Sequence, residues 1–287
     1  MERHLLLTMG DDLSSLHAVR FVGSFFKDKT KTRLTLLYIA SKSESTSRDD
    51  IEQKKRDARL IDAAHEKGKA ALDAGRKLLR TLGFRDDTIS TEIMDRRFGT
   101  VKDIVYAANT GLYDAVVLGR RGYALFEKAF ATSVSREIME HRIHFPLWFC
   151  RLPEEGRKNV LLCVDDTEPS LRIADHVGFI LAGEEDHTVT IFHVDEGEGK
   201  NIEMILRAAK EKLVDNKVEE ERIKIKVVRG SKTIKAIHEE TDRGAYAAVA
   251  VGRGGAASAG TFKKWLMGSR SMKLLEELEK AALWVSK

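Results

Sequence analysis

Two short stretches, Val117–Gly122 (VLGRRG) and Thr132–Ser135 (TSVS), decide the fold of this 287-residue chain. The first begins with apolar residues typical of a buried strand and ends in a glycine turn. The second is rich in the hydroxyls typical of a helix N-terminus. In a parallel α/β sheet this arrangement presents backbone N–H groups and a helix dipole to a phosphate. It returns near the end of the chain, where Val249–Gly255 (VAVGRGG) leads to Gly268–Ser271 (GSRS).

The rest of the chain also reads as two copies of one unit. Residues 4–9 match residues 159–164, and residues 34–39 match residues 189–194, both at an offset of 155. Residues 113–119 match residues 246–252 at an offset of 133, and residues 146–149 match residues 282–285 at 136. Ordered offsets with few breaks indicate an internal duplication.

The composition is that of a globular protein, with 43% hydrophobic and 33% charged residues. The 49 basic and 45 acidic residues nearly balance, which argues against nucleic-acid or membrane partners. No apolar run is long enough to span a membrane, and Met1–Leu7 does not resemble a signal peptide. Cys150 and Cys163 lie in apolar runs, so we expect buried thiols, a reducing compartment and a cytoplasmic location.

Each copy alternates apolar runs with amphipathic stretches, which predicts an α/β fold with parallel strands. In copy one we expect strands at about 4–9, 34–40, 89–94, 115–119 and 146–150, and a long helix at 51–82. In copy two we expect a first strand at about 159–165 and a shorter helix at 202–214. Thr100–Asp103 resembles a capping box. The polar segment 151–158 separates two predicted domains, residues 1–152 and 157–287.

Ligands of a doubly wound sheet bind beyond the carboxyl ends of its strands. There the turn after strand one, the end of strand two (Val194 in copy two) and the glycine turn should meet. Asp165 follows strand one of copy two, whereas Gly10 occupies that position in copy one. The Asp165 carboxylate suits a ribose hydroxyl or a base amino group, and it equally suits a helix cap. His193 ends strand two and is best read as a packing residue.

The glycine turns and the downstream hydroxyls are the second part of the candidate site. Glycine allows the backbone to approach a phosphate, and serine hydroxyls can donate to its oxygens. A single Gly-x-x-Gly is weak evidence, but the same pattern after a strand in both copies is stronger. The candidates are Gly119, Gly122, Ser133 and Ser135 in copy one, and Gly252, Gly255, Gly268, Ser269 and Ser271 in copy two.

With these motifs the chain resembles a tandem universal stress protein over essentially its whole length. Nucleotide-binding members of that family carry Gly-2x-Gly-9x-Gly-(Ser/Thr) and an aspartate that ends strand one. The resemblance implies two doubly wound, five-stranded parallel sheets of the Rossmann-like, adenine nucleotide alpha hydrolase-like type. It also implies ATP or AMP as ligand, held through the aspartate, the glycines and the hydroxyls, and leaves open whether Mg²⁺ accompanies it.

Both copies depart from the family pattern. Copy one keeps the nine-residue spacing but has Thr132 in place of the third glycine and Gly10 in place of the aspartate. Copy two keeps the aspartate and all three glycines, but twelve residues separate Gly255 from Gly268. We therefore place the predicted nucleotide site in copy two and interpret copy one as structural.

Trp148 and Trp284 occupy matched positions in the last strand of each copy. The family resemblance suggests that these two strands pair, which would make an internal pseudo-dimer of one chain. Simple core packing of the two tryptophans is the alternative. Whether the chain forms a further homodimer or binds other proteins stays open.

Three other functions compete with nucleotide binding. A scaffold of the same fold without a ligand fits the departures from the pattern. A phosphoacceptor receiver would need an aspartate at the end of a later strand, where Arg229 and Gly252 stand. An enzyme is not indicated, because the chain has no P-loop, no metal-spaced His/Cys cluster and no nucleophile turn, although slow ATP hydrolysis stays open.

Overall fold

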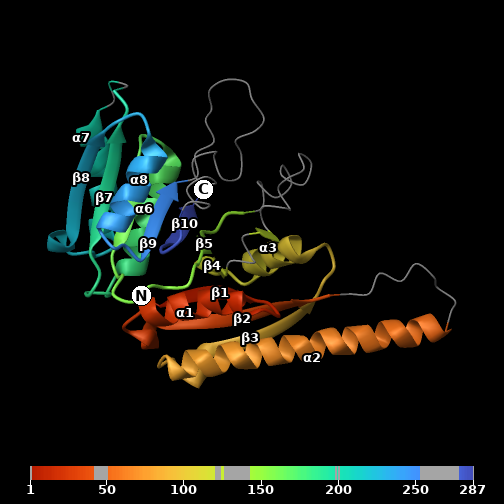
Figure 1. Cartoon of the computed structure of the whole chain (residues 1–287). Helices are drawn as coiled ribbons and strands as arrows, with labels where there is room; N and C mark the ends of the chain where they lie inside the picture. The colour runs from red at the N-terminus through yellow and green to blue at the C-terminus, as the bar shows by residue number, and fades with distance from the viewer. Residues whose placement is uncertain are drawn as a thin grey trace, which may run out of the picture.

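The computed structural model describes residues 2–41, 51–119, 124–125, 143–197, 199, 201–252 and 278–286. In this part of the chain the strands form one ten-stranded sheet in the order β3-β2-β1-β4-β5-β10-β9-β6-β7-β8. The first five strands of the chain make one half of the sheet and the last five make the other (Figure 1). Among the described helices, none combines the length and apolar character that a membrane span requires.

The first half follows the predicted alternation of strands and helices, and its strand ends lie within two residues of those expected. The long helix α2 is the predicted one and ends one residue early. The elements are β1 (Arg3–Met9), η1 (Leu13–Ser15), α1 (Leu16–Phe25), η2 (Lys29–Lys31), β2 (Thr32–Ala40), α2 (Ile51–Thr81), η3 (Asp86–Thr88), β3 (Ile89–Asp95), α3 (Thr100–Thr110), β4 (Ala115–Leu118) and β5 (Leu147–Phe149).

The second half repeats this order with a shorter second helix. Residues 153–156, where the domain boundary is predicted, lie between β5 and β6. The elements are β6 (Val160–Cys163), α6 (Glu168–Leu181), β7 (Val189–Asp195), α7 (Ile202–Asp215), η4 (Glu220–Arg222), β8 (Ile223–Arg229), α8 (Thr233–Arg243), β9 (Ala248–Gly252) and β10 (Ala282–Ser286).

The expected capping box before α3 is wrong in one respect. Gly99, at φ 111°, is the N-cap of α3 and forms no side-chain cap. The buried carboxylate of Asp103 instead reaches back and accepts hydrogen bonds from the backbone N–H groups of Arg97 and Phe98, at 2.9 and 3.1 Å. This carboxylate orders the turn between β3 and α3, which a Thr100 hydroxyl cap was expected to do.

The two halves join through their last strands, as the family resemblance suggested. Every described pair of neighbouring strands is parallel except β5 and β10, which are antiparallel with Trp148 opposite Trp284. The two indole rings stack at 4.1 Å with 9° between their planes. The two five-stranded sheets are therefore continuous, and the chain is a pseudo-dimer built around this strand pair.

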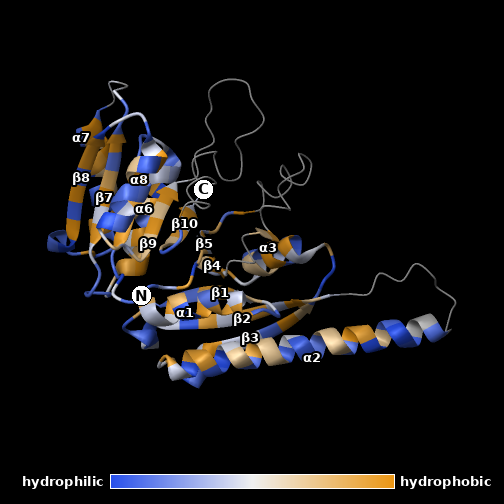
Figure 2. Ribbon diagram, viewed as in Figure 1, coloured by the Kyte–Doolittle hydropathy of each residue, from blue (hydrophilic) through white to orange (hydrophobic). Residues whose placement is uncertain are grey.

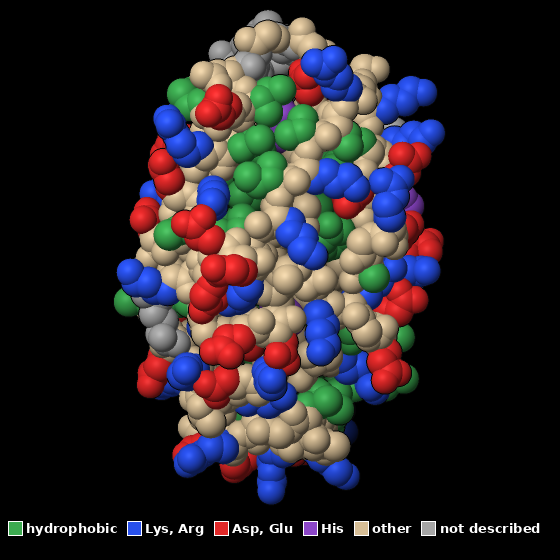
Figure 3. Space-filling model, turned by 90° about the vertical axis from the view of Figure 1, so that its left-hand side faces the viewer, with side chains coloured by type: hydrophobic (Ala, Val, Ile, Leu, Met, Phe, Trp, Pro, Cys, Tyr) green, Lys and Arg blue, Asp and Glu red, His purple; other side chains and the backbone are tan. Residues whose placement is uncertain are grey.

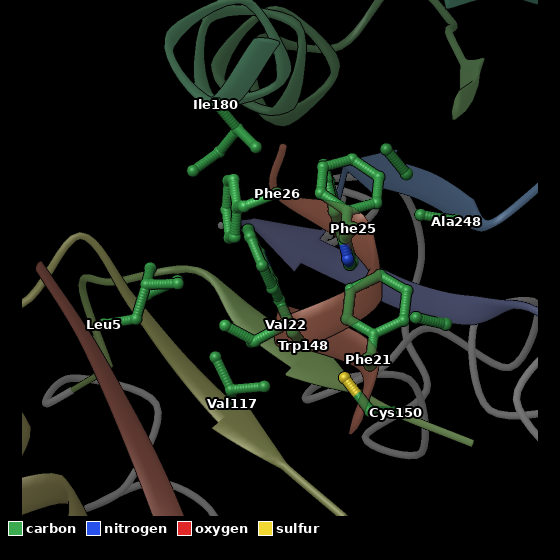
Figure 4. Packing of buried hydrophobic residues seen from close by; sticks show 14 of the residues in the cluster. Leu5, Phe21, Val22, Phe25, Phe26, Val117, Trp148, Cys150, Ile180 and Ala248 are labelled. Carbon is green, nitrogen blue, oxygen red and sulfur yellow. The ribbon is translucent and has the colours of Figure 1, made fainter. Parts of the chain in front are cut away.

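Two buried apolar layers cover the faces of the sheet. One layer packs α1, α2, α6 and α7 on one face, and the other packs α3 and α8 on the opposite face. The strands are accordingly the most apolar elements, while the helices show an apolar stripe beside a polar one (Figure 2). At the joint between the halves, Phe21 of α1 and Phe26 just after it pack against Trp148, and Phe25 packs against Trp284 (Figure 4).

The two tryptophans at the joint differ in the hydrogen bonding of their indole N–H groups. The Trp148 indole Nε1–H donates to His176 Nε2 of α6 at 3.0 Å. Burial lowers the pKa of His176 to about 3, so this ring is neutral and can accept. Phe21 occupies the matching position in the first half and lies edge-on to Trp284. The buried Trp284 Nε1–H has no hydrogen-bond partner among the described residues.

The burial predicted for both cysteines is found in full for Cys150 only. Cys150 is buried, and Cys163 is partly buried at the end of β6. Burial raises the pKa of each thiol, and the Asp165 carboxylate raises that of Cys163 further. Neither thiol is therefore a reactive thiolate at neutral pH.

Candidate functional site

The three parts of the predicted site in the second half end at one edge of the sheet. Cys163 of β6 is in register with Phe192 of β7 and with Val251 of β9. Asp165 follows this level by two residues, Val194 also by two, and Gly252 by one. Because the three strands are parallel, these residues share the carboxyl edge, where ligands of such sheets bind.

Asp165 is exposed at that edge, and its own turn holds its carboxylate. Oδ1 accepts hydrogen bonds from the backbone N–H of Thr167 at 3.0 Å and from the Thr167 hydroxyl at 2.5 Å. The Asp165 N–H donates to Ser170 Oγ at 2.9 Å. This Asx turn leads into α6, which begins at Glu168. The helix cap that the sequence left open for Asp165 is not formed, because the N-cap of α6 is Thr167, which makes no side-chain cap bond. Asp165 instead forms the turn that precedes the helix.

A side chain at the end of β7 contacts the residue that precedes this turn. His193 is buried, and its Nδ1 lies 2.8 Å from the carbonyl oxygen of Val164, which immediately precedes Asp165. A carbonyl oxygen only accepts, so Nδ1 carries the proton. The packing role expected for His193 is consistent with this contact. Val194 is half-buried and packs partly against the apolar layer of α3 and α8.

Close packing explains why glycine is required at positions 252 and 119, which the sequence did not reveal. A Cβ on Gly252 would lie 2.5 Å from the backbone of Pro169 and of Ser170, where α6 begins. A Cβ on Gly119 would lie 2.5 Å from the carbonyl oxygen of Ser14. In both halves the first glycine lets the turn after strand one approach the end of the fourth strand.

The same edge of the first half is arranged differently. Gly10 stands where the second half has Asp165, as expected. The Asp11 carboxylate accepts a hydrogen bond from the hydroxyl of Tyr38, and the Asp12 carboxylate accepts one from the N–H of Ser14 at 2.8 Å. The Tyr38 contact was missed, although the repeat offset aligns Tyr38 with His193 and gave a signal for it.

The remaining predicted site residues lie outside the described part of the chain. These are Gly122, Ser133 and Ser135 in the first half, and Gly255, Gly268, Ser269 and Ser271 in the second. The structure therefore places Gly119, Asp165, Val194 and Gly252. Among the described residues no group of three or more His, Cys, Asp or Glu side chains is placed to hold a metal ion.

Comparison with known proteins gives the family. The model of the universal stress protein family matches residues 1–148, about half of the chain, and the chain belongs to this family. No curated protein sequence matches.

Solved structures give the same fold. A universal stress protein from Archaeoglobus fulgidus DSM 4304 is 17% identical, with a TM-score of 0.65 over 99% of this chain and 96% of that chain. A putative universal stress protein from Pseudomonas aeruginosa UCBPP-PA14 is 16% identical, with a TM-score of 0.54 over 100% of this chain and 93% of that chain. Both span the two halves.

A third solved structure is a universal stress protein in complex with cAMP. It is 21% identical and covers 45% of this chain and 95% of that chain, with a TM-score of 0.37. That ligand is a property of that protein, and a likeness of this degree supports no conclusion about the ligand of this chain.

Proposed function

We propose that this protein is a regulatory protein that binds an adenine nucleotide, ATP or AMP, in its second half. Asp165, Val194 and Gly252 would form the described part of the site. Gly255, Gly268, Ser269 and Ser271 would hold the phosphates in the manner of the family pattern. The proposal rests on family membership together with one observation, the exposed Asp165 carboxylate at the carboxyl edge beside the end of β9.

The chemistry of this edge suits a nucleoside. An ionised carboxylate accepts hydrogen bonds from ribose hydroxyls or from an adenine amino group. One oxygen of Asp165 serves the Asx turn, which fixes the carboxylate on a rigid turn above the buried His193. The first half has no carboxylate at this position, since Gly10 replaces it and Asp11 is bound by Tyr38.

One alternative of the same fold remains, a scaffold without a ligand. It is favoured by the finding that Asp165 and Gly252 both have structural roles, in the Asx turn and in the approach of α6 to β9. A cytoplasmic location stays a prediction from the sequence. Turnover of the nucleotide, accompanying Mg²⁺, protein partners and homodimer formation stay open.

Calorimetry with ATP and with AMP on the full chain tests the proposal, in buffer with Mg²⁺ and in buffer with EDTA. Asp165→Asn keeps an oxygen for the Asx turn and removes the charge, so it should weaken binding about tenfold or more. Asp12→Asn is the matched control, because it makes the same change in the equivalent turn of the first half. It should leave the affinity unchanged.

Gly122→Val tests the choice of half. Binding that survives Asp165→Asn and is lost in Gly122→Val would move the site to the first half. A folded protein that shows neither heat nor a thermal shift at millimolar ATP and AMP would exclude the nucleotide site and leave the scaffold.

A further inference from the structure

Strand β8 ends the sheet on the side of the second half, and one of its faces is apolar and exposed. Successive side chains of a strand point to opposite faces, and Ile223 packs against the layer that contains α6 and α7. Ile225 and Val227 point to the same face as Ile223, yet they are 52% and 41% exposed. We call these three residues the apolar strip of β8. The view of the molecule from this side shows apolar side chains among charged ones (Figure 3).

The opposite face of β8 is packed within the chain. Lys226 Nζ pairs with the buried Glu240 of α8 at 2.5 Å, and Val228 packs against the layer of α3 and α8. On the strip side, α7 packs against β7 and α6 and leaves Ile225 and Val227 exposed. The strip is therefore the face of β8 that its own chain does not cover.

The first half treats the matched strand differently. The strand registers and the repeat offset of 155 align Ile225 with Thr91 of β3 and Val227 with Ile93. Ile93 packs against the layer that contains the long helix α2, and the exposed position holds the polar Thr91. The second half has apolar residues at both positions and the shorter helix α7 beside them. Threonine also favours a strand, so strand propensity alone does not explain isoleucine at position 225.

The edge of β8 decides how a partner can approach. Lys224 and Lys226 alternate with the strip along this edge strand. Lysines on an edge discourage the addition of a further strand. A partner is therefore expected to lie on the strip face to face, and not to extend the sheet.

The charges at the two ends of the strip favour a second copy of this chain as the partner. Lys210 of α7 pairs with Glu220, which precedes β8, at 2.5 Å. Arg229, the last residue of β8, lies 3.4 Å from Asp195. Each end thus carries one charge of each sign. A two-fold contact places one end of a strip over the other end of its mate, so opposite charges can meet there without net repulsion. A strongly acidic or basic partner finds no such match.

We propose that the apolar strip of β8 is the surface through which two copies of this chain form a symmetric dimer. In this contact each strip covers the other, and Ile225 and Val227 of both copies leave water. The matched strand β3 holds Thr91 in place of Ile225, so association stops at two copies. The contact differs from the β5–β10 pair, which joins the two halves within one chain. The strip is short, so the dimer is a weak one.

Sedimentation velocity on the full chain tests the dimer, at concentrations from about 5 to 500 µM, which bracket weak association. The wild-type protein should shift from monomer to dimer as its concentration rises, without larger species. A protein that stays monomeric throughout would overturn the proposal. A growing series of larger species would also overturn it, because a two-fold contact closes on itself.

Three substitutions test the surface itself. Ile225→Asp brings two carboxylates into the contact and should weaken association about tenfold or more. Ile225→Thr introduces the residue of the first half and should weaken association several-fold, and it decides the question if the aspartate disturbs folding. Thr91→Asp is the matched control, because it adds the same charge at the matched exposed position of β3, and it should associate as the wild type does. Wild-type association of Ile225→Thr, or an equal loss in Thr91→Asp, would contradict a dimer through β8.

Discussion

Gly252 is the last residue of β9. Helix α6, which packs on the sheet there, leaves no room for a side chain at this position. The start of α6 approaches so closely that a Cβ would meet backbone atoms of Pro169 and Ser170 at 2.5 Å. Backbone atoms at a helix start cannot move aside as the end of a long side chain can. Gly230, the residue after β8, contrasts with it, because a Cβ there would meet nothing within 4 Å.

At the residue scale we therefore expect Gly252→Ala to destabilise the protein by about 1–3 kcal/mol, the usual cost of overpacking. Gly230→Ala is the control and should change stability little, because that position is open and has no positive φ. Urea unfolding of the three proteins measures both differences. If the two variants were equally stable, the close approach of α6 to β9 would not be the reason for the glycine.

Helix α2 is the element in which the two halves differ most. It has 31 residues against 14 in α7, its counterpart, and runs past the end of the sheet (Figure 1). Its C-terminal part packs on the sheet through Leu72 and Leu79. Two glycines lie in this helix at positions where it comes close to the sheet. A Cβ on Gly68 would lie 2.7 Å from the Tyr38 ring, and one on Gly75 would lie 2.9 Å from the end of the Met9 side chain.

At the element scale we expect alanine substitutions at these two glycines to change the stability of the protein in opposite directions. Alanine favours a helix over glycine by about 1 kcal/mol. In Gly75→Ala the flexible Met9 side chain can move, so we expect a neutral or stabilised protein. In Gly68→Ala the Tyr38 ring is buried and bound to Asp11, so we expect a net loss of stability. Thermal unfolding distinguishes them, and a stabilising Gly68→Ala would show that Tyr38 can move.

The outer strand β8 shows how the sheet ends. Ile225 and Val227 are exposed and alternate with Lys224 and Lys226. Viewed from this side, basic and acidic side chains are interspersed around the apolar ones (Figure 3). Lysines on an edge strand discourage pairing with a further strand. The alternation therefore suits an edge, and a single-sign surface for nucleic acid is not seen on this face.

At the scale of the whole molecule, the ion pair between Arg3 of β1 and Glu184 after α6, at 3.0 Å, tests how strongly the halves depend on each other. Both side chains are 1% exposed, so removing one leaves the other buried without its opposite charge. We expect Arg3→Met or Glu184→Met to cost about 3–5 kcal/mol, and the double variant to cost much less than the sum. Urea unfolding in a double-mutant cycle measures the coupling.

The exposed pair Lys27–Asp186 spans the same joint and is the control. Its removal through Lys27→Met should produce little change, because solvent screens such a pair. Additive effects of the two Arg3 and Glu184 substitutions would show that the halves do not rely on the buried pair.

The sequence by itself indicated a repeated unit and determined most of the helices and strands. Local patterns carry this information, because apolar periodicity and glycine turns depend on near neighbours. The offsets of 155, 133 and 136 located matching strands, and the element ends agree with the structure within a few residues. The pairing of the last strands was anticipated through the family resemblance, with core packing as an open alternative.

Only the tertiary structure decided the contacts between segments that are distant in the chain. The approach of α6 to Gly252, the hydroxyl of Tyr38 on Asp11 and the Arg3–Glu184 pair all join such segments. A side chain's neighbours across a fold depend on the packing of whole elements, which no local pattern encodes. For the same physical reason the sequence could name Asp165 and Gly252 as site residues, while their structural roles became visible only when the strands were brought into register.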